Sequence, residues 1–182
     1  MRNVLLIVTL MLMVNIIFAQ DTTYYQNGSI KEVGKLNDNG RKQGEWKFYK
    51  ENGSLEKSID YIDGSGFWWK YFYENGQIES EGSYNSRTNK TGMWKYYNEN
   101  GVLIKKGEIV NGKYHGKWEY FYDNGKLLKS GEFKNNQQSG EWKVYHSTTG
   151  MVKMIGKFEN GEPIGEWKVY DEFGVYLKSI NN

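Results

Sequence analysis

The 182-residue chain has no cysteine, one proline and two histidines. Without thiols it forms no disulfides and no cysteine-ligated metal site, and it offers no N-terminal cysteine for lipid attachment after processing. The two histidines, His115 and His146, lie far apart in the sequence and do not suggest a metal cluster. We therefore expect neither a metal ion nor a cofactor.

The chain also lacks an excess of charge of either sign, and it lacks catalytic motifs. Its 24 basic residues nearly balance its 22 acidic residues, which predicts no electrostatic attachment to nucleic acid. No serine elbow, phosphate-binding loop or HExxH sequence occurs. These absences predict a protein that is not an enzyme and has no catalytic residues.

Long apolar runs are absent except at the N-terminus. Arg2 precedes an almost wholly apolar stretch over residues 4–14, and Ala19 places a small residue where a signal peptidase would cut. An uncleaved anchor is the alternative, but the stretch is short for a membrane span and contains Asn15. We predict a signal peptide over residues 1–19 and an exported product that is periplasmic, secreted or at the cell surface, with no stable membrane insertion after cleavage.

Tryptophan is abundant and regularly spaced. Of the 7 tryptophans, those in register recur about every 24 residues, and each is followed three residues later by tyrosine or phenylalanine: Trp46, Trp69, Trp94, Trp118, Trp142 and Trp167. A fixed period in this range is typical of stacked structural repeats. We predict a repeat array over residues 20–182, made of a half unit over 22–43 and then about six units of about 24 residues.

Each unit reads as two β-strands. The run around the tryptophan is short and rich in aromatic and β-branched residues, and it ends in a glycine turn that is Asn-Gly in four units. Asn-Gly between such runs predicts a hairpin, because both residues tolerate the positive φ of a tight turn. Aromatic-rich strands joined in this way predict an all-β fold, an elongated and twisted antiparallel meander of about fourteen strands.

The second run of each unit has its own pattern of apolar residues and glycine. Apolar residues stand two and eight positions after the turn glycine, a further glycine stands six positions after it, and even offsets predict one shared face. Glycine inside a strand marks a close approach, so we expect these glycines to make room for a ring from the neighbouring strand. The glycines are Gly82, Gly107, Gly131 and Gly156, whereas Ile59 and Ile180 break the rule.

Two rows of aromatic residues are candidates for binding. The six tryptophans in register share one face, where they either pack against the glycines or form a stripe that binds sugars; we favour packing. The rings three positions later lie on the opposite face, and Trp68 stands outside the register. We therefore predict a binding surface that consists of Trp68, Tyr49, Phe72, Tyr97, Phe121, Tyr145 and Tyr170.

Carboxylates are spaced as a surface ladder and not as a catalytic pair. Each of three glutamates precedes a lysine by two positions, which puts both on one face of a strand: Glu45 with Lys47, Glu141 with Lys143, and Glu166 with Lys168. This arrangement predicts solvated ion pairs.

The segments Asn111-Gly112-Lys113-Tyr114-His115-Gly116-Lys117-Trp118 and Phe158-Glu159-Asn160-Gly161, the latter continuing through Trp167 to Tyr170, resemble MORN repeats. The closest resemblance is to the bacterial MORN-repeat variant family, whose members are often labelled antitoxins. The resemblance covers nearly all of the chain after the leader. It implies β-hairpin arrays that serve as scaffolds or protein-binding surfaces, with lipid binding proposed for some eukaryotic relatives.

The predicted function is that of an exported, non-enzymatic scaffold that binds a protein partner at the cell envelope or outside the cell. A glycan-binding module of the cell surface is the first alternative, and an antitoxin-like partner of a toxin is the second. An open meander leaves two free edge strands, so we also consider a homodimer formed through these edges or through the ring-bearing face.

Overall fold

The computed structural model describes residues 20–62, 64–85 and 89–182. The described residues form β-strands that are joined by turns and loops. Among them no helix is long and apolar enough to cross a membrane. The predicted signal peptide falls on residues 1–19, outside the described residues, and it stays a prediction.

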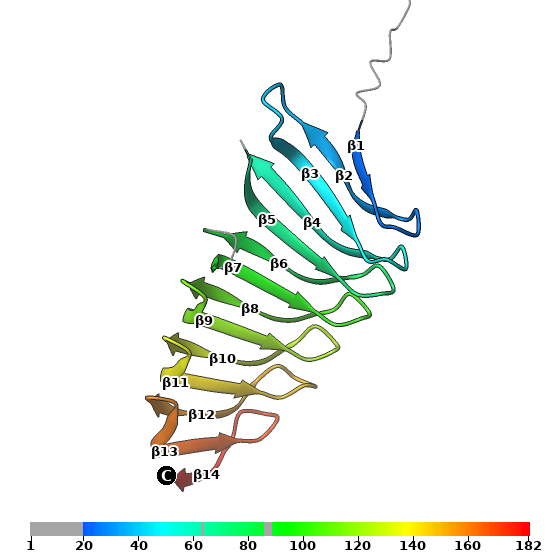
Figure 1. Ribbon diagram of the computed structural model, residues 1–182. Helices are drawn as coiled ribbons and strands as arrows, with labels where there is room; N and C mark the ends of the chain where they lie inside the picture. Colours follow the sequence, from blue (N-terminus) through cyan, green and yellow to red (C-terminus); the bar gives the residue numbers. More distant parts are fainter. Residues whose placement is uncertain (1–19, 63, 86–88) are drawn as a thin grey trace, which may run out of the picture.

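The described residues form a single 14-stranded antiparallel sheet in which each strand pairs with the next along the chain. Figure 1 shows the strands stacked side by side into an elongated, twisted ribbon, with β1 and β14 at opposite ends. The all-β meander predicted from the repeat is therefore confirmed. The strands are β1 (Asp21–Tyr24), β2 (Ile30–Leu36), β3 (Lys42–Tyr49), β4 (Leu55–Ile62), β5 (Ser65–Phe72), β6 (Ile78–Tyr84), β7 (Lys90–Tyr97), β8 (Leu103–Val110), β9 (Lys113–Phe121), β10 (Leu127–Lys134), β11 (Gln137–Tyr145), β12 (Val152–Glu159), β13 (Glu162–Tyr170) and β14 (Tyr176–Asn181).

The register places tryptophan and glycine opposite each other across the sheet. Trp118 on β9 faces Gly107 on β8 and Gly131 on β10. We call this side of the sheet, which carries the six tryptophans in register, the tryptophan face. Its centre is a cluster of Trp94, Trp118 and Ile109, around which half-buried tyrosines and Phe133 pack. A single sheet thus builds its core on one side from rings.

The turns that follow the tryptophan strands differ from the expected tight hairpin. In the turn after β5, only Gly76 has a positive φ (82°), and the side chain of Asn75 accepts a hydrogen bond from the backbone N–H of Gln77 at 2.9 Å. The asparagine holds this loop through its carboxamide, so its backbone does not need a left-handed conformation. The hairpins lie where Asn-Gly predicted them, but the backbone geometry expected for asparagine was wrong here.

Two Asn-Gly turns at the other edge of the sheet do have the predicted geometry. Asn111 and Gly112, between β8 and β9, have φ values of 51° and 79°. Asn160 and Gly161, between β12 and β13, have φ values of 52° and 90°. These are two-residue turns in which both residues are left-handed, the geometry that matches the twist of antiparallel strands.

One set of apolar residues lies on the face opposite to the predicted one. The cause is a bulge near the start of each even-numbered strand from β4 onward. Tyr49 pairs with Leu55, whereas Phe48 pairs with Lys57, so β4 carries one extra residue at Glu56. The extra residue reverses the alternation of side chains. As a result, Leu55 and its equivalents lie on the face opposite the tryptophans, not beside the strand glycines as even spacing predicted. Those equivalents are Ile78, Leu103, Leu127, Val152 and Tyr176.

A second irregularity bends the tryptophan strands. In five of them a glycine with positive φ stands two residues before the tryptophan: Gly44, Gly92, Gly116, Gly140 and Gly165. In β9 this glycine lies within a bulge, since Gly107 pairs with Trp118 while Glu108 pairs with His115. Bulges bend a strand and increase its twist, and Figure 1 shows the starts of β9, β11 and β13 curling away from the rest of the strand.

The edge formed by the turns after the odd-numbered strands carries a row of long-range hydrogen bonds, which we call turn links. Tyr25, Tyr73 and Tyr122 each donate a hydroxyl hydrogen bond to a backbone carbonyl of the next unit, at 2.7 to 2.8 Å. His146 occupies the same place, with Nε2 3.0 Å from the carbonyl oxygen of Tyr170. A link therefore joins turns that are separated by two strands.

Candidate functional site

The tryptophans in register are packed, and most of their surface is inaccessible. Exposure is 0 to 6% for five of them, Trp46, Trp94, Trp118, Trp142 and Trp167. Each of these indoles lies against the glycine of the preceding strand so closely that a Cβ on that glycine would overlap the ring. This is the close approach predicted from the glycines, and it leaves no continuous stripe of accessible tryptophans for a ligand.

Four of the six indole N–H groups are also used within the sheet, whereas that of Trp167 has no partner among the described residues. Trp46 Nε1 donates to the carbonyl of Lys35 at 2.9 Å, and Trp118 Nε1 donates to the carbonyl of Glu108 at 3.0 Å. Trp94 and Trp142 make the equivalent bonds at 3.1 and 3.2 Å. In each case the acceptor follows the glycine by one residue, so the same glycine admits the ring and brings the carbonyl within reach.

Trp69 is the exception to the packing, because no glycine of the preceding strand receives its ring. The strand before it carries Ile59 in place of glycine, and the register pairs Ile59 directly with Trp69. Ile59 is buried, whereas Trp69 is half-buried, and its Nε1 is inaccessible and has no hydrogen-bond partner among the described residues. The isoleucine side chain fills the space that a glycine leaves open, so this indole cannot lie flat on the preceding strand.

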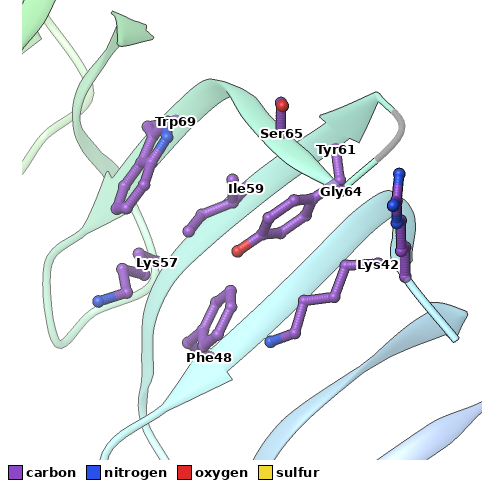
Figure 2. Close-up of a pocket in the computed structure, with 9 residues that line it drawn as sticks. Lys42, Phe48, Lys57, Ile59, Tyr61, Gly64, Ser65 and Trp69 are labelled. Atoms are coloured by element: carbon purple, nitrogen blue, oxygen red, sulfur yellow. The ribbon is translucent and has the colours of Figure 1, made fainter. Parts of the chain in front are cut away.

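A groove opens on the tryptophan face at this irregular unit. It has a volume of about 620 Å³, a size that suits a small ligand. Figure 2 shows Phe48 on β3, Ile59 and Tyr61 on β4, and Trp69 on β5 around it. Arg41, Lys42, Lys57, Gly64 and Ser65 complete the lining.

The groove combines aromatic walls with cations. In Figure 2 the ammonium groups of Lys42 and Lys57 lie on either side of the Phe48 ring, and their Nζ atoms are 4.6 and 5.5 Å from its centroid. Lys42 pairs with Glu32, and Lys57 lies 3.6 Å from the carboxylate of Glu56. Ring faces suit the apolar side of a sugar, and ammonium groups suit an acidic substituent.

The opposite side of the sheet carries all of the predicted binding rings. We call it the charged face, because glutamate and lysine alternate along its strands. Trp68 lies on this face, where the register pairs it with Asp60 and Ser83. All seven predicted residues are half-buried: Trp68, Tyr49, Phe72, Tyr97, Phe121, Tyr145 and Tyr170. The structure thus brings them onto one face, and their role in binding stays a prediction.

Each of these rings except Trp68 pairs across its hairpin with a neighbour on the same face. Tyr97 lies opposite Leu103, and Phe121 lies opposite Leu127. Such cross-strand pairs stabilise antiparallel strands and account for much of the covered surface of each ring. The rest of each ring is accessible to solvent and therefore to a partner.

Tyr97 also has a polar anchor. Its hydroxyl donates a hydrogen bond to Glu81 Oε1 at 2.8 Å. Burial raises the pKa of Tyr97 to about 12, and the hydrogen bond and negative charge of Glu81 add to the shift. The phenol is consequently neutral over the physiological pH range and holds a fixed orientation on the charged face.

Two of the three ion pairs predicted on the charged face are present. Lys143 lies 3.0 Å from Glu141, and Lys47 lies 3.8 Å from Glu45. Glu166, whose predicted partner is Lys168, accepts a hydrogen bond from the hydroxyl of Ser179 on β14. A further cluster joins Glu119 to Lys117 and Lys106, and the hydrogen bond from Lys117 is the main cause of the lowered pKa of Glu119.

The two histidines lie apart in the structure. His115 is exposed on β9, whereas His146 makes the turn link to Tyr170. In the part of the chain that the structure describes, no group of three histidine or acidic side chains is arranged to hold a metal ion.

The groove is the part of the candidate site that sequence reasoning missed. Arg41, Lys42 and Lys57 were not among the predicted residues, since they stand at different positions in their units. One signal was present, because Ile59 breaks the glycine pattern at the position that faces Trp69. A broken pattern in one unit marks a local change in packing, but only the structure shows that the change opens a groove.

Comparison with known proteins identifies the repeat. A family model described as the MORN repeat variant matches residues 42–63, 69–86, 90–111 and 114–135. Each matched segment lies on one hairpin, from β3 and β4 to β9 and β10. The search of curated proteins found no match. β11 to β14 continue the same register beyond the matched segments. The chain is therefore a MORN-repeat protein, an array of stacked β-hairpins in which each unit adds two strands to one sheet.

Proposed function

We propose that this protein is an exported, non-enzymatic scaffold whose charged face binds a protein partner. MORN repeats are repeat scaffolds that often contact proteins or membranes, and the family is generally non-catalytic. The observation that carries the proposal is the single row of half-buried rings along the charged face, flanked by charges of both signs. Aromatic residues within a polar surround are enriched at protein interfaces.

Export is the part of the proposal that rests on residues 1–19. Their basic start, apolar run and small residue at Ala19 are typical of a cleaved signal peptide. The intact mass of the protein recovered from the envelope and medium of its host tests this. A mass that corresponds to a chain starting at Gln20 supports export, and an unprocessed chain found inside the cell would contradict it.

The binding face is tested by affinity capture from the host envelope. A specifically captured protein is purified, and its affinity is then measured for the unchanged chain and for a Tyr97→Ala/Tyr145→Ala variant. Both substitutions remove rings from the interior of the row, so we expect at least a tenfold loss of affinity, equivalent to about 1.4 kcal/mol.

Phe173→Ala is the matched control. Phe173 is 83% exposed, but it lies in the last turn and outside the charged-face row, so its loss should leave affinity unchanged. Circular dichroism and a thermal melt establish that both variants fold. Unchanged affinity after the loss of both tyrosines would exclude this row as the binding surface.

Glycan binding is a second candidate function, and the groove at β3, β4 and β5 is the observation that favours it. Burial of five tryptophans removes the continuous stripe that a glycan was expected to use. The groove retains two accessible rings, Phe48 and Trp69, beside Lys42 and Lys57. This combination suits a sugar that carries a carboxylate or sulfate group.

Retention on acidic polysaccharide, measured against its neutral counterpart, tests the second candidate. Lys57→Ala should weaken retention, because Lys57 lines the groove. Lys129→Ala is the matched control, since Lys129 stands at the equivalent position, 5.8 Å from a Trp142 ring that is packed against Gly131. Equal retention of the two variants, or no retention of the unchanged chain, would remove this candidate.

A further inference from the structure

The two ends of the sheet present unpaired edges with exposed apolar side chains. In the described residues β1 pairs only with β2, and β14 pairs only with β13. Tyr24 at the first end is 61% exposed, and Leu177 at the other end is 58% exposed. Residues equivalent to Tyr176 in interior strands, such as Leu103 and Leu127, are half-buried, whereas Tyr176 itself is 53% exposed. An edge of this kind favours pairing with another strand.

The two ends of the sheet are of the two alternating strand types, so joining them would continue the alternation. The sheet alternates odd-numbered strands, which carry the tryptophan position, with even-numbered strands, which carry the glycine position. β1 is an odd strand in this sense, because Asp21 pairs with Gly34 just as Trp118 pairs with Gly131. β14 is an even strand, because Ile180 pairs with Trp167. The strand type that would follow β14 is therefore the type of β1, the first strand of the sheet.

We propose that copies of this chain assemble head to tail, with β14 of one copy pairing with β1 of the next. The register follows from an interior junction, where Lys105 pairs with Tyr120 and Lys106 pairs with Glu119. The same spacing pairs Lys178 with Thr23, Ser179 with Thr22 and Ile180 with Asp21. The tryptophan face and the charged face then each continue from one copy to the next.

Charge complementarity supports this register. Interior lysines at the position of Lys178 reach the residue at the tryptophan position of the following strand: Lys57 Nζ lies 5.8 Å from the Trp69 ring, and Lys129 Nζ lies 5.8 Å from the Trp142 ring. At the proposed junction that position is Asp21. Lys178 would therefore meet a carboxylate across the junction, and opposite charges on neighbouring strands stabilise pairing.

The junction joins two different edges of the sheet, β14 of one copy and β1 of the next. The contact is heterologous and repeats, so it gives an open chain of molecules and not a closed dimer.

The junction is shorter than an interior one, because β1 covers only Asp21–Tyr24. We therefore expect reversible assembly that grows with protein concentration. Analytical ultracentrifugation of the purified chain, with its N-terminus read by intact mass, should show a weight-average mass that rises from one chain toward several. No partner protein is present, so the result does not depend on the proposed function.

Charge reversal tests the register. Lys178→Asp and Asp21→Lys each place like charges at the junction, and either variant alone should remain monomeric. An equimolar mixture should assemble with the two variants alternating, because every contact between different variants again joins one carboxylate to one ammonium group. The double variant should also assemble. Lys153→Asp, a reversal at an exposed lysine on β12 away from the ends, is the control and should assemble like the unchanged chain.

Three outcomes would overturn the proposal. The first is a chain that stays monomeric at every concentration. The second is assembly of the single variants with the affinity of the unchanged chain. The third is loss of assembly in Lys178→Asp that neither mixing nor the double variant restores, which would indicate pairing of β14 with another β14. Circular dichroism of each variant distinguishes lost assembly from lost folding.

Discussion

At the residue scale, the pairing of tryptophan with glycine is the unit of stability in this sheet. Trp118 is fully buried, packs against Gly107 and donates its indole N–H to Glu108. Trp118→Ala should therefore lower the free energy of unfolding by about 3 to 5 kcal/mol, as is typical of a large aromatic removed from a packed site. Urea unfolding followed by circular dichroism measures this loss.

Trp69→Ala is the matched comparison for that substitution. Trp69 is half-buried and its indole N–H has no partner in the described chain, so its loss should cost clearly less. A loss of less than about 1 kcal/mol for Trp118→Ala would mean that its indole is dispensable for packing.

The glycine side of the pair makes a separate prediction. A Cβ on Gly107 would overlap the indole of Trp118, so Gly107→Ala should destabilise the fold by about 1 to 3 kcal/mol or more. When Trp118 is already alanine, the clash disappears, and the same glycine substitution should cost much less. A double-mutant cycle measures this coupling, and additive effects of the two substitutions would contradict the packing.

Tyr97 makes the fold sensitive to alkaline pH. Burial, assisted by Glu81, raises its pKa from 10.0 to about 12 in the folded chain. The neutral phenol is therefore favoured by folding, and its contribution is complete below about pH 10 and is lost as the pH rises toward 12. Tyr97→Phe should flatten the fall in stability across this window, as measured by urea unfolding at a series of pH values. An unchanged slope would contradict the assignment to Tyr97.

At the element scale, the two edges of the sheet use asparagine differently, and this difference can be measured. Asn111 has a φ of 51°, a conformation that glycine adopts readily and alanine does not. Asn111→Ala should cost about 1 to 2 kcal/mol of stability, whereas Asn111→Gly should be nearly neutral. Thermal melts of the two variants provide the comparison, and equal losses would exclude backbone strain as the cause.

The positions of the turns could be predicted from the sequence, but their conformations could not. Asn75-Gly76 and Asn111-Gly112 are the same dipeptide, yet only the second asparagine is left-handed. The difference arises from the extra loop residues after β5, where Tyr73 N–H bonds to the carbonyl of Gln77. Bulges are missed for a similar reason: Glu56 is an ordinary strand residue, and only its unpaired place in the register reverses the faces.

At the scale of the whole molecule, each unit contacts its neighbours and stability should be close to a sum of nearest-neighbour terms. Removal of residues 108–131, which joins Gly107 to Glu132 and keeps the register, should leave a folded array with one unit fewer. The dependence of unfolding on urea concentration should become shallower, because less surface is exposed on unfolding. An unfolded product would mean that the units are not interchangeable.

The repeat made the array predictable, while the candidate groove depends on a departure from the repeat. The period of the tryptophans and the strand glycines predicts which residues pack, since both recur at fixed offsets. The groove lined by Lys42, Lys57 and Trp69 opens where Ile59 takes the place of the glycine opposite Trp69. This effect is a matter of side-chain volume at a single contact, and it becomes visible only when neighbouring strands are placed.

The turn links have a consequence for how the array can vary in length. The links span 24 residues from Tyr73 to Tyr97 but 23 from Tyr122 to Tyr145, and in each the acceptor is the carbonyl of the residue three positions after a tryptophan. A link therefore fixes which turns meet, whereas the number of residues between them varies. Added loop residues are therefore tolerated mainly at the opposite edge of the sheet, where the loop over residues 37–41 lies. The linked edge of the sheet sets the spacing of the units, and the opposite edge is free to acquire new loops.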